Sequence, residues 1–303
     1  MRAAELKERA RGFGADLVGI AAAERFAPLP PERNPASVFP ECRSVIVVGR
    51  RILRGSLRGI EEGTNFGSTY RTFGFAWLED NFLAQTTYDL TCWIETQGVE
   101  AVPLFGYAEA GMPKGRPVAP GKPAPNVYVD AEFAAQAAGL GEMGLADVFL
   151  TPEYGPRQRF ALILTDAELE PDAVVGQRLC GDCGACVEAC PFGAIDASRK
   201  RTVGVPGHEM AVATVDYEIC AACNNGAMRG PGRGSRPDRL AAACIRACVV
   251  RLEAGGKCRN AFAQPFRKRA PWAVGHLGRP VETKPSANTA ATTGCGRMSG
   301  GAR

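Results

Sequence analysis

The sequence predicts a mixed α/β (α+β) domain followed by a small cysteine-rich domain. Two observations predict this order. Over about the first 170 residues, apolar runs typical of strands alternate with stretches that have helical periodicity. Nine of the 12 cysteines then lie between Cys180 and Cys258. A length of 303 residues suits two domains, and a hydrophobic content of 46% is that of a folded protein with a core.

The elements of the first domain follow from local patterns. The run 44–49 is apolar at almost every position, so we expect a strand that is covered on both faces. Residues 69–97 carry aromatic and leucine side chains at helical spacing, and Gly98 suits a helix C-terminus. The other expected elements are a helix over 3–12, strands over 15–21, 99–104 and 159–166, a helix over 130–138, and loops over 27–40 and 106–126.

The most specific motif is the run from Cys180 to Pro191, which reads C-x₂-C-x₂-C-x₃-C-P. This is the bacterial ferredoxin spacing for ligation of 4Fe–4S clusters. The first three thiolates, of Cys180, Cys183 and Cys186, would bind one cluster. The fourth, of Cys190, ordinarily binds a second cluster. The second domain is therefore expected to be a two-cluster ferredoxin-like domain.

Ligands for the second cluster must come from the later cysteines. The pair Cys244 and Cys248 keeps the x₃ spacing, while Ala241 stands where an earlier cysteine would be expected. Crossed ligation would give Cys248 to the first cluster as its fourth ligand. Cys190, Cys220 and Cys244 would bind the second, with Cys223 replacing the missing cysteine. The alternatives are a degenerate site that binds a 3Fe cluster, zinc or nothing, and Cys258 is left as a free thiol.

Two adjacent clusters would conduct single electrons, and the first domain is the expected destination. A cysteine cluster at ligand spacing in a chain without an apolar leader indicates a reducing, cytoplasmic location. The sequence contains no apolar run of membrane-spanning length. The net charge of +4 does not by itself indicate a nucleic-acid partner.

The chain resembles the epoxyqueuosine reductase and reductive dehalogenase superfamily over roughly residues 1–262. The resemblance is carried by segments in a fixed order ahead of the cysteine run. They are the segment Cys42 to Gly49, Val129 to Glu132, Ala138 to Gly144, Leu150 to Gly155 and Ala161 to Pro171.

Residues 263–303 are expected from their composition to form a basic strap and a disordered tail. The resemblance implies a nitroreductase-like domain over 1–172 that holds a corrinoid (cobalamin), and a domain with two 4Fe–4S clusters over 173–262. It implies reduced ferredoxin or flavodoxin as electron donor and a small-molecule or tRNA-linked substrate. Asp130 maps onto the proposed proton donor, although its position also suits a helix N-cap. The cofactor contacts implied by these segments are Gly139, Gly141, Gly144 and Tyr154.

Some features depart from the epoxyqueuosine reductases. Glu142 replaces their tryptophan, and Tyr70-Arg-Thr-Phe-Gly74 stands where they carry Asp-Tyr-His. A side branch with another substrate is therefore expected, and an electron-transfer protein without corrinoid chemistry is the alternative. The G-x-G-x-x-G pattern of 139–144 follows an expected helix instead of a strand, which argues against a dinucleotide site. His208 is expected at the surface. Phe266 and Trp272 are expected to anchor the strap to the first domain.

Overall fold

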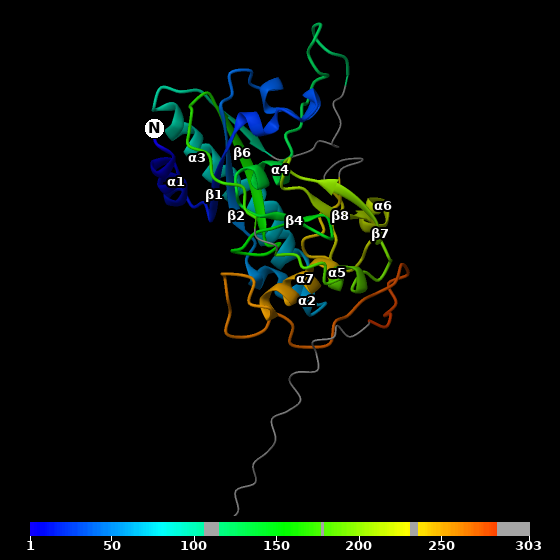
Figure 1. Cartoon of the computed structure of the whole chain (residues 1–303). Helices are drawn as coiled ribbons and strands as arrows, with labels where there is room; N and C mark the ends of the chain where they lie inside the picture. Colours follow the sequence, from blue (N-terminus) through cyan, green and yellow to red (C-terminus); the bar gives the residue numbers. More distant parts are fainter. Residues whose placement is uncertain (106–114, 177–178, 231–235, 284–303) are drawn as a thin grey trace, which may run out of the picture.

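A four-stranded antiparallel sheet forms the centre of the first domain. The computed structural model describes residues 1–105, 115–176, 179–230 and 236–283. The sheet has the order β1-β2-β6-β3, with β2 and β6 in the middle (Figure 1). The strand bounds are β1 (Leu17–Ala22), β2 (Ser44–Arg51), β3 (Ala101–Phe105) and β6 (Gln158–Thr165). All three pairings are antiparallel, which makes the fold α+β.

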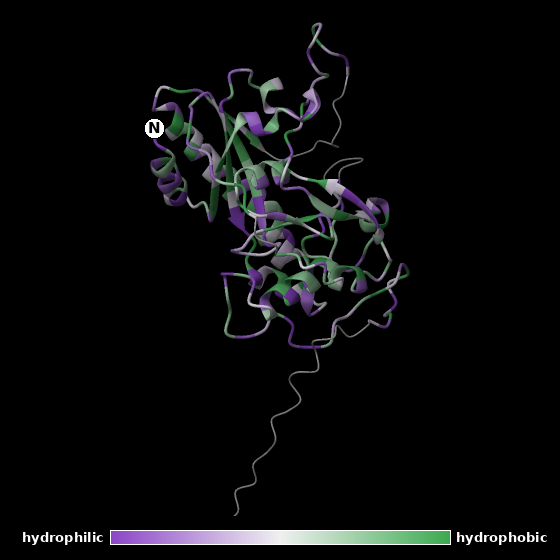
Figure 2. Ribbon diagram, viewed as in Figure 1, coloured by the Kyte–Doolittle hydropathy of each residue, from purple (hydrophilic) through white to green (hydrophobic). Residues whose placement is uncertain are grey.

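Both faces of this sheet are covered, as the apolar run of β2 predicts. Side chains alternate across a strand, so Val45 and Val47 pack on one face with helix α4 (Ala131–Ala137). Ile46 and Val48 pack on the other face with α1 (Ala3–Gly12) and α3 (Ala84–Glu95). The central strands are accordingly apolar over most of their length (Figure 2).

The helix expected over 69–97 is present, but its first half is π-helical. It comprises η5 (Gly67–Ala76) and η6 (Leu78–Leu83), and α3 follows directly. The buried Tyr70 hydroxyl donates a hydrogen bond to Asp238 at 2.8 Å, which ties this segment to the cysteine-rich domain. The proline-rich stretch before β2 contains only single turns. The turns before β2 are η1 (Ala23–Phe26), η2 (Pro31–Arg33) and η3 (Pro35–Ser37). After β2 come the turn η4 (Arg54–Leu57) and the short helix α2 (Arg58–Glu61).

Two hairpins were not expected from the sequence. The first joins β4 (Glu142–Gly144) to β5 (Val148–Leu150), and the second joins β7 (Ile195–Val203) to β8 (Met210–Val215). Strand β7 is mostly exposed and carries the charged run 199–201, which conceals any apolar alternation. The second hairpin lies between the two cysteine segments.

The cysteine-rich domain shares a core with the first domain. Its helices are α5 (Ala185–Glu188), α6 (Tyr217–Ala221) and α7 (Ala243–Ala254). Leu145 and Leu150, from the first hairpin, are buried in one cluster with Ile195 and Ile245. Because this contact is apolar and continuous, the cysteine positions are fixed relative to the sheet.

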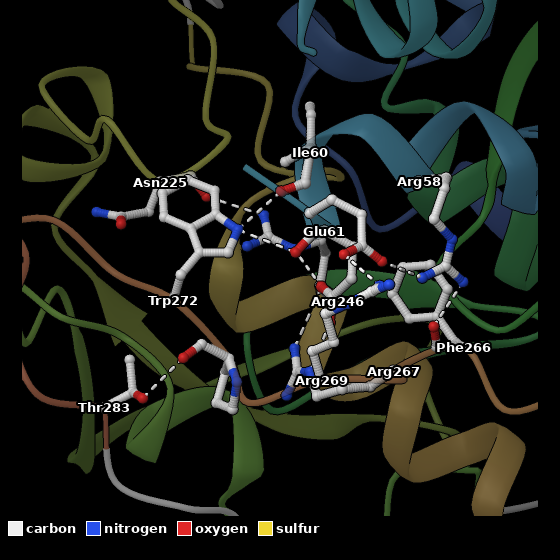
Figure 3. Close-up of polar contacts among 12 residues, drawn as sticks. Arg58, Ile60, Glu61, Asn225, Arg246, Phe266, Arg267, Arg269, Trp272 and Thr283 are labelled. Carbon is white, nitrogen blue, oxygen red and sulfur yellow. Dashed lines mark hydrogen bonds and ion pairs between the residues drawn. The ribbon is translucent and has the colours of Figure 1, made fainter. Parts of the chain in front are cut away.

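A C-terminal strap crosses from the cysteine-rich domain to α2. Phe266 is 1% exposed, and the Trp272 indole Nε1 donates to the carbonyls of Ile60 and Glu61 at 2.9 and 3.0 Å. Beneath it, Glu61 is bound by Arg246 of α7 at 2.7 Å and by Arg267 of the strap (Figure 3). The expected anchoring by Phe266 and Trp272 is therefore confirmed. The expected tail beyond residue 283, with Cys295, and residues 106–114 of the long loop lie outside the described residues.

Candidate iron–sulfur and cofactor site

The structure brings four cysteines together at the start of the cysteine-rich domain. The thiols of Cys180 and Cys183 are close enough to those of Cys186 and Cys248 to raise the pKa of both, in addition to the larger effect of burial. Cys248 comes from α7, more than 50 positions along the chain, and reaches this group because α5 packs against α7. This is the set of four proposed for the first cluster.

A second set of four cysteines surrounds an apolar cavity. Its lining includes Cys190, Cys220, Cys223 and Cys244. Cys220 and Cys223 lie at and beyond the end of α6, while Cys244 lies in the first turn of α7. These are the residues that crossed ligation assigns to the second cluster, with Cys223 in place of a cysteine at position 241. Ligation itself stays a prediction.

A polynuclear cluster and a single metal ion require different arrangements of thiols. In the part of the chain that the structure describes, no three His, Cys, Asp or Glu side chains converge on one metal-ion position. In a 4Fe–4S cluster each thiolate binds a different iron, so the sulfurs stand around a cavity. Four cysteines line the second cavity, as a cluster with four protein ligands would require.

Burial makes these thiols weak acids until a metal binds. It raises the pKa of Cys186 and Cys220 to about 11 and that of Cys244 to about 12. Thiolates are the metal-binding form, so cluster assembly must displace protons. Backbone N–H groups support the sulfurs: Leu145 donates to Cys180 Sγ, and Ala194 to Cys190 Sγ, both at 3.3 Å. Such bonds stabilise negative charge on sulfur and tune cluster potentials.

Glu142 holds the beginning of the cysteine run in place. Its carboxylate Oε1 accepts hydrogen bonds from the backbone N–H groups of Leu179 and Cys180, both at 2.8 Å, and the side chain is 2% exposed. The departure from tryptophan at this position thus has a structural reason. Motif comparison could flag the residue, but only the fold shows what it binds.

A cavity of about 450 Å³ lies beside Cys180. Its walls come from the first hairpin (Met143 and Leu145), from the cysteine run (Cys180 to Asp182) and from 207–211. His208 lines it and is exposed, as expected. The volume lies within the range of small-molecule pockets, roughly 300–1,000 Å³. The cavity therefore joins the first cysteine group to a space that a ligand can occupy.

The glycines expected to contact a cofactor face the protein's own chain. A Cβ on Gly139 would lie 2.3 Å from the Ala173 carbonyl oxygen, and one on Gly141 would lie 2.0 Å from the Leu150 carbonyl oxygen. Gly144 is closed by the Leu150 side chain at 2.9 Å. Close packing within the protein therefore explains glycine at all three positions. The segment also follows α4 and begins a hairpin, contrary to the geometry of a dinucleotide site.

Tyr154 also lies apart from the cavity beside Cys180. It occupies the turn after β5, where its backbone N–H donates to Thr151 Oγ1 at 3.1 Å. Burial raises the pKa of its hydroxyl, and Asp16 and Arg51 are its charged neighbours. It is not part of the lining of that cavity. The structure thus gives Tyr154 a local role in this turn.

Asp130 is the N-cap of α4. Its Oδ1 accepts from the backbone N–H groups of Glu132 and Phe133 at 2.9 and 3.0 Å, the geometry of a capping carboxylate. Beside it, burial and the carboxylates of Asp130 and Asp147 raise the pKa of Glu132 to about 8. Sequence reasoning missed Glu132, which it used only as the end of a family segment, and Asp147, which stands in no recognised motif. Asp130 is not part of the lining of the cavity beside Cys180.

Comparison with known proteins identifies a 4Fe–4S segment around the first cysteine run. Residues 173–196 match the 4Fe-4S binding domain family. A tetrachloroethene reductive dehalogenase from Desulfitobacterium hafniense is 41% identical over 75 residues, which is 24% of this chain and 14% of that protein. An epoxyqueuosine reductase from Gloeobacter violaceus is 27% identical over 306 positions, covering 89% of this chain and 82% of the relative.

A solved structure shares the fold. A catabolic reductive dehalogenase matches 93% of this chain and 41% of its own, with a TM-score of 0.52 at 18% identity. The resemblance to the epoxyqueuosine reductases and reductive dehalogenases is therefore confirmed, and both kinds of relative are oxidoreductases. In the described residues, no helix is both long and apolar enough to cross a bilayer.

Proposed function

We propose that the protein is an iron–sulfur oxidoreductase that passes electrons through two 4Fe–4S clusters to a corrinoid, which reduces a substrate. The observation that carries this proposal is the pair of four-cysteine groups, the first of which reaches a ligand-sized cavity through Cys180. Electrons from a reduced ferredoxin or flavodoxin would cross from one group to the other and leave at the cavity.

Helix α7 contributes one cysteine to each of the two groups. Cys244 and Cys248 are four residues apart, so they lie on one face of α7 on consecutive turns. Each belongs to a different group of four. Cys186 of the first group lies in the short helix α5, and Cys190 of the second group follows two residues after the end of that helix. Clusters held this way would be neighbours in a shared protein core.

The walls of the cavity offer both apolar and polar contacts, which a flat corrin ring with polar side groups would use. Met143, Leu145 and Met210 offer apolar contact, while 207–208 and Glu209 form an exposed rim that can admit a polar periphery. A bound corrinoid would supply a strongly reducing, nucleophilic cobalt centre. The chain's own contribution would be to hold the cofactor beside Cys180 and to restrict water.

Asp130 is the proposed proton donor, and its position limits how a substrate would bind. It caps the N-terminus of α4, whereas Gln136, in the last turn of that helix, donates from Nε2 to the His208 carbonyl at 2.7 Å. Helix α4 has seven residues and is therefore about 10 Å long. A substrate that met both the cavity and Asp130 would have to extend along this helix.

Metal analysis of protein produced anaerobically with cobalamin tests the proposal. Two 4Fe–4S clusters and one corrinoid require about eight iron and one cobalt per chain. About four iron would refute the second cluster. About eight iron per chain without cobalt would show that the protein binds both clusters but no corrinoid, and would refute the corrinoid part of the proposal.

An electron-transfer protein without corrinoid chemistry is the second candidate. Two observations favour it: the glycines of 139–144 close on the protein's own chain, and Asp130 lies away from the cavity beside Cys180. In that case the clusters would exchange electrons with a partner protein, and added cobalamin would not bind. A direct binding measurement with cobalamin on the iron-loaded protein separates the two candidates.

A further inference from the structure

Arg239 is a buried arginine between the second cysteine group and the first domain. It precedes α7 and is 7% exposed. Its Nη2 donates to the carbonyls of Ala146 and Asp147 in the first hairpin, both at 2.8 Å. The ring of Tyr217 covers the guanidinium with its centroid 5.1 Å away. These contacts fix the plane of the guanidinium.

Arg239 also borders the four cysteines. Arg239 lines the same cavity as Cys190, Cys220, Cys223 and Cys244. Its Nη1 is buried, and none of the described residues accepts a hydrogen bond from it. An arginine nitrogen without an acceptor in an apolar cavity costs free energy, because it has lost its water. The arrangement therefore points to an acceptor inside the cavity.

The charge of Arg239 also lacks a direct counterion. Among the described residues it forms no ion pair with a carboxylate, since its partners are carbonyl groups. The nearby Asp147 is bound through Oδ2 by the Tyr217 hydroxyl, by Arg201 at 2.6 Å and by Arg236 at 3.5 Å. A buried cation is tolerated when an anion is close by. A 4Fe–4S cluster with four thiolate ligands is an anion and would be that counterion.

We propose that Arg239 donates a hydrogen bond from Nη1 to the second cluster or its thiolates and raises the reduction potential of that cluster. The inference rests on the proposed second cluster and assigns to Arg239 a function that cluster binding alone does not require. Reduction adds one negative charge to the cluster. A fixed positive charge and an N–H donor favour the more negative state, so both raise the potential.

The test compares four variants by redox titration of the iron-loaded protein, followed by electron paramagnetic resonance. Arg239→Met removes the charge and the donors at similar volume, and Arg239→Lys keeps the charge. Arg236→Met is the matched control, because Arg236 covers the same Tyr217 ring at 4.6 Å but is 59% exposed and does not line the cavity. Cys223→Ser identifies which signal belongs to the second cluster.

In Arg239→Met we expect the ratio of reduced to oxidised second cluster at a fixed potential to fall at least tenfold. A tenfold change equals about 59 mV for a one-electron couple. The first cluster and the Arg236→Met control should change less than twofold. If Arg239→Met loses the second cluster, Arg239→Lys should keep it with a ratio within threefold of wild type, because the counterion is retained.

Three results would overturn the inference. One is a second cluster in Arg239→Met that titrates within twofold of wild type. Another is an equal change in the ratio of reduced to oxidised second cluster, or an equal loss of that cluster, in Arg239→Met and Arg239→Lys. Either result would show that the positive charge of Arg239 does not cause the effect. The third is wild-type protein with about four iron per chain, which refutes the second cluster itself and is seen before any variant is made.

Discussion

Removing the carboxylate of Glu61 should strongly accelerate unfolding, because this group neutralises two buried arginines. The side chains of Glu61, Arg246 and Arg267 are 6%, 2% and 7% exposed, and the ion pairs measure 2.7 and 2.5 Å (Figure 3). In Glu61→Gln two guanidinium groups would remain buried beside each other without a counterion. Breaking a buried ion pair in this way costs about 3–5 kcal/mol.

We expect this loss of free energy to appear as a faster unfolding rate. The three residues join α2, α7 and the strap across nearly 200 positions of sequence, so we expect the contact to be broken in the transition state. Since about 1.4 kcal/mol is a factor of ten, unfolding should be faster by roughly a hundredfold or more. Anaerobic unfolding in urea, followed by circular dichroism and cluster absorbance, measures it, and urea avoids screening the charges.

Glu62→Gln is the matched control. Glu62 pairs with Arg58 at 3.1 Å and with Arg269 at 2.6 Å, but the Arg269 side chain is 71% exposed. Exposed pairs contribute about 0–1 kcal/mol, so unfolding should accelerate by less than about fivefold. A Glu61→Gln protein that unfolds no faster than Glu62→Gln would refute the reasoning.

Further predictions concern the site. Cys248→Ser should lower the iron content of anaerobically produced protein, whereas Cys258→Ser should leave it unchanged; equal iron in both would contradict the assignment. Asp130→Asn should keep the helix cap and the iron but abolish turnover, and retained turnover would exclude the proton-donor role. The pKa of Glu132 is raised from 4.5 to about 8, so its native carboxyl binds a proton that the unfolded chain has released. Stability should therefore fall as pH rises between these values, and Glu132→Gln should flatten that fall in urea unfolding measured from pH 5 to 8. Glu142→Ala should reduce cluster occupancy, and Glu142→Gln, which retains an acceptor oxygen for the two backbone N–H groups, should restore most of it.

The sequence alone predicted what depends on local pattern. The helical spacing over 69–97 and the cap at Asp130 reflect contacts between near neighbours. The apolar run of β2 marks a strand that is buried along most of its length, and each of these elements lies within a few residues of its expected bounds. The C-x₂-C-x₂-C-x₃-C-P run is equally local. Residues 173–196, which contain it, match a 4Fe-4S family.

Some of the sequence-based interpretations of the site were incomplete for the same reason. Gly139 and Gly141 suggested close approach of a cofactor, but the approaching groups are carbonyls of Ala173 and Leu150. Glu142 was recognisable only as a departure from a family pattern. A residue type at a given spacing shows that the backbone or the charge matters there, but it does not identify the group on the other side.

Tertiary structure decided which distant residues meet. It placed Cys248 with Cys180 and Cys183, because α7 packs against α5. It also placed Cys223 with Cys190 in the lining of one cavity. It also buried Arg239 against the second cysteine group, although no sequence pattern marks that arginine. Such contacts join residues many positions apart, and their energies depend on burial and on the direction of each polar atom. Local sequence sets neither quantity, since both arise only when the two domains pack into one core.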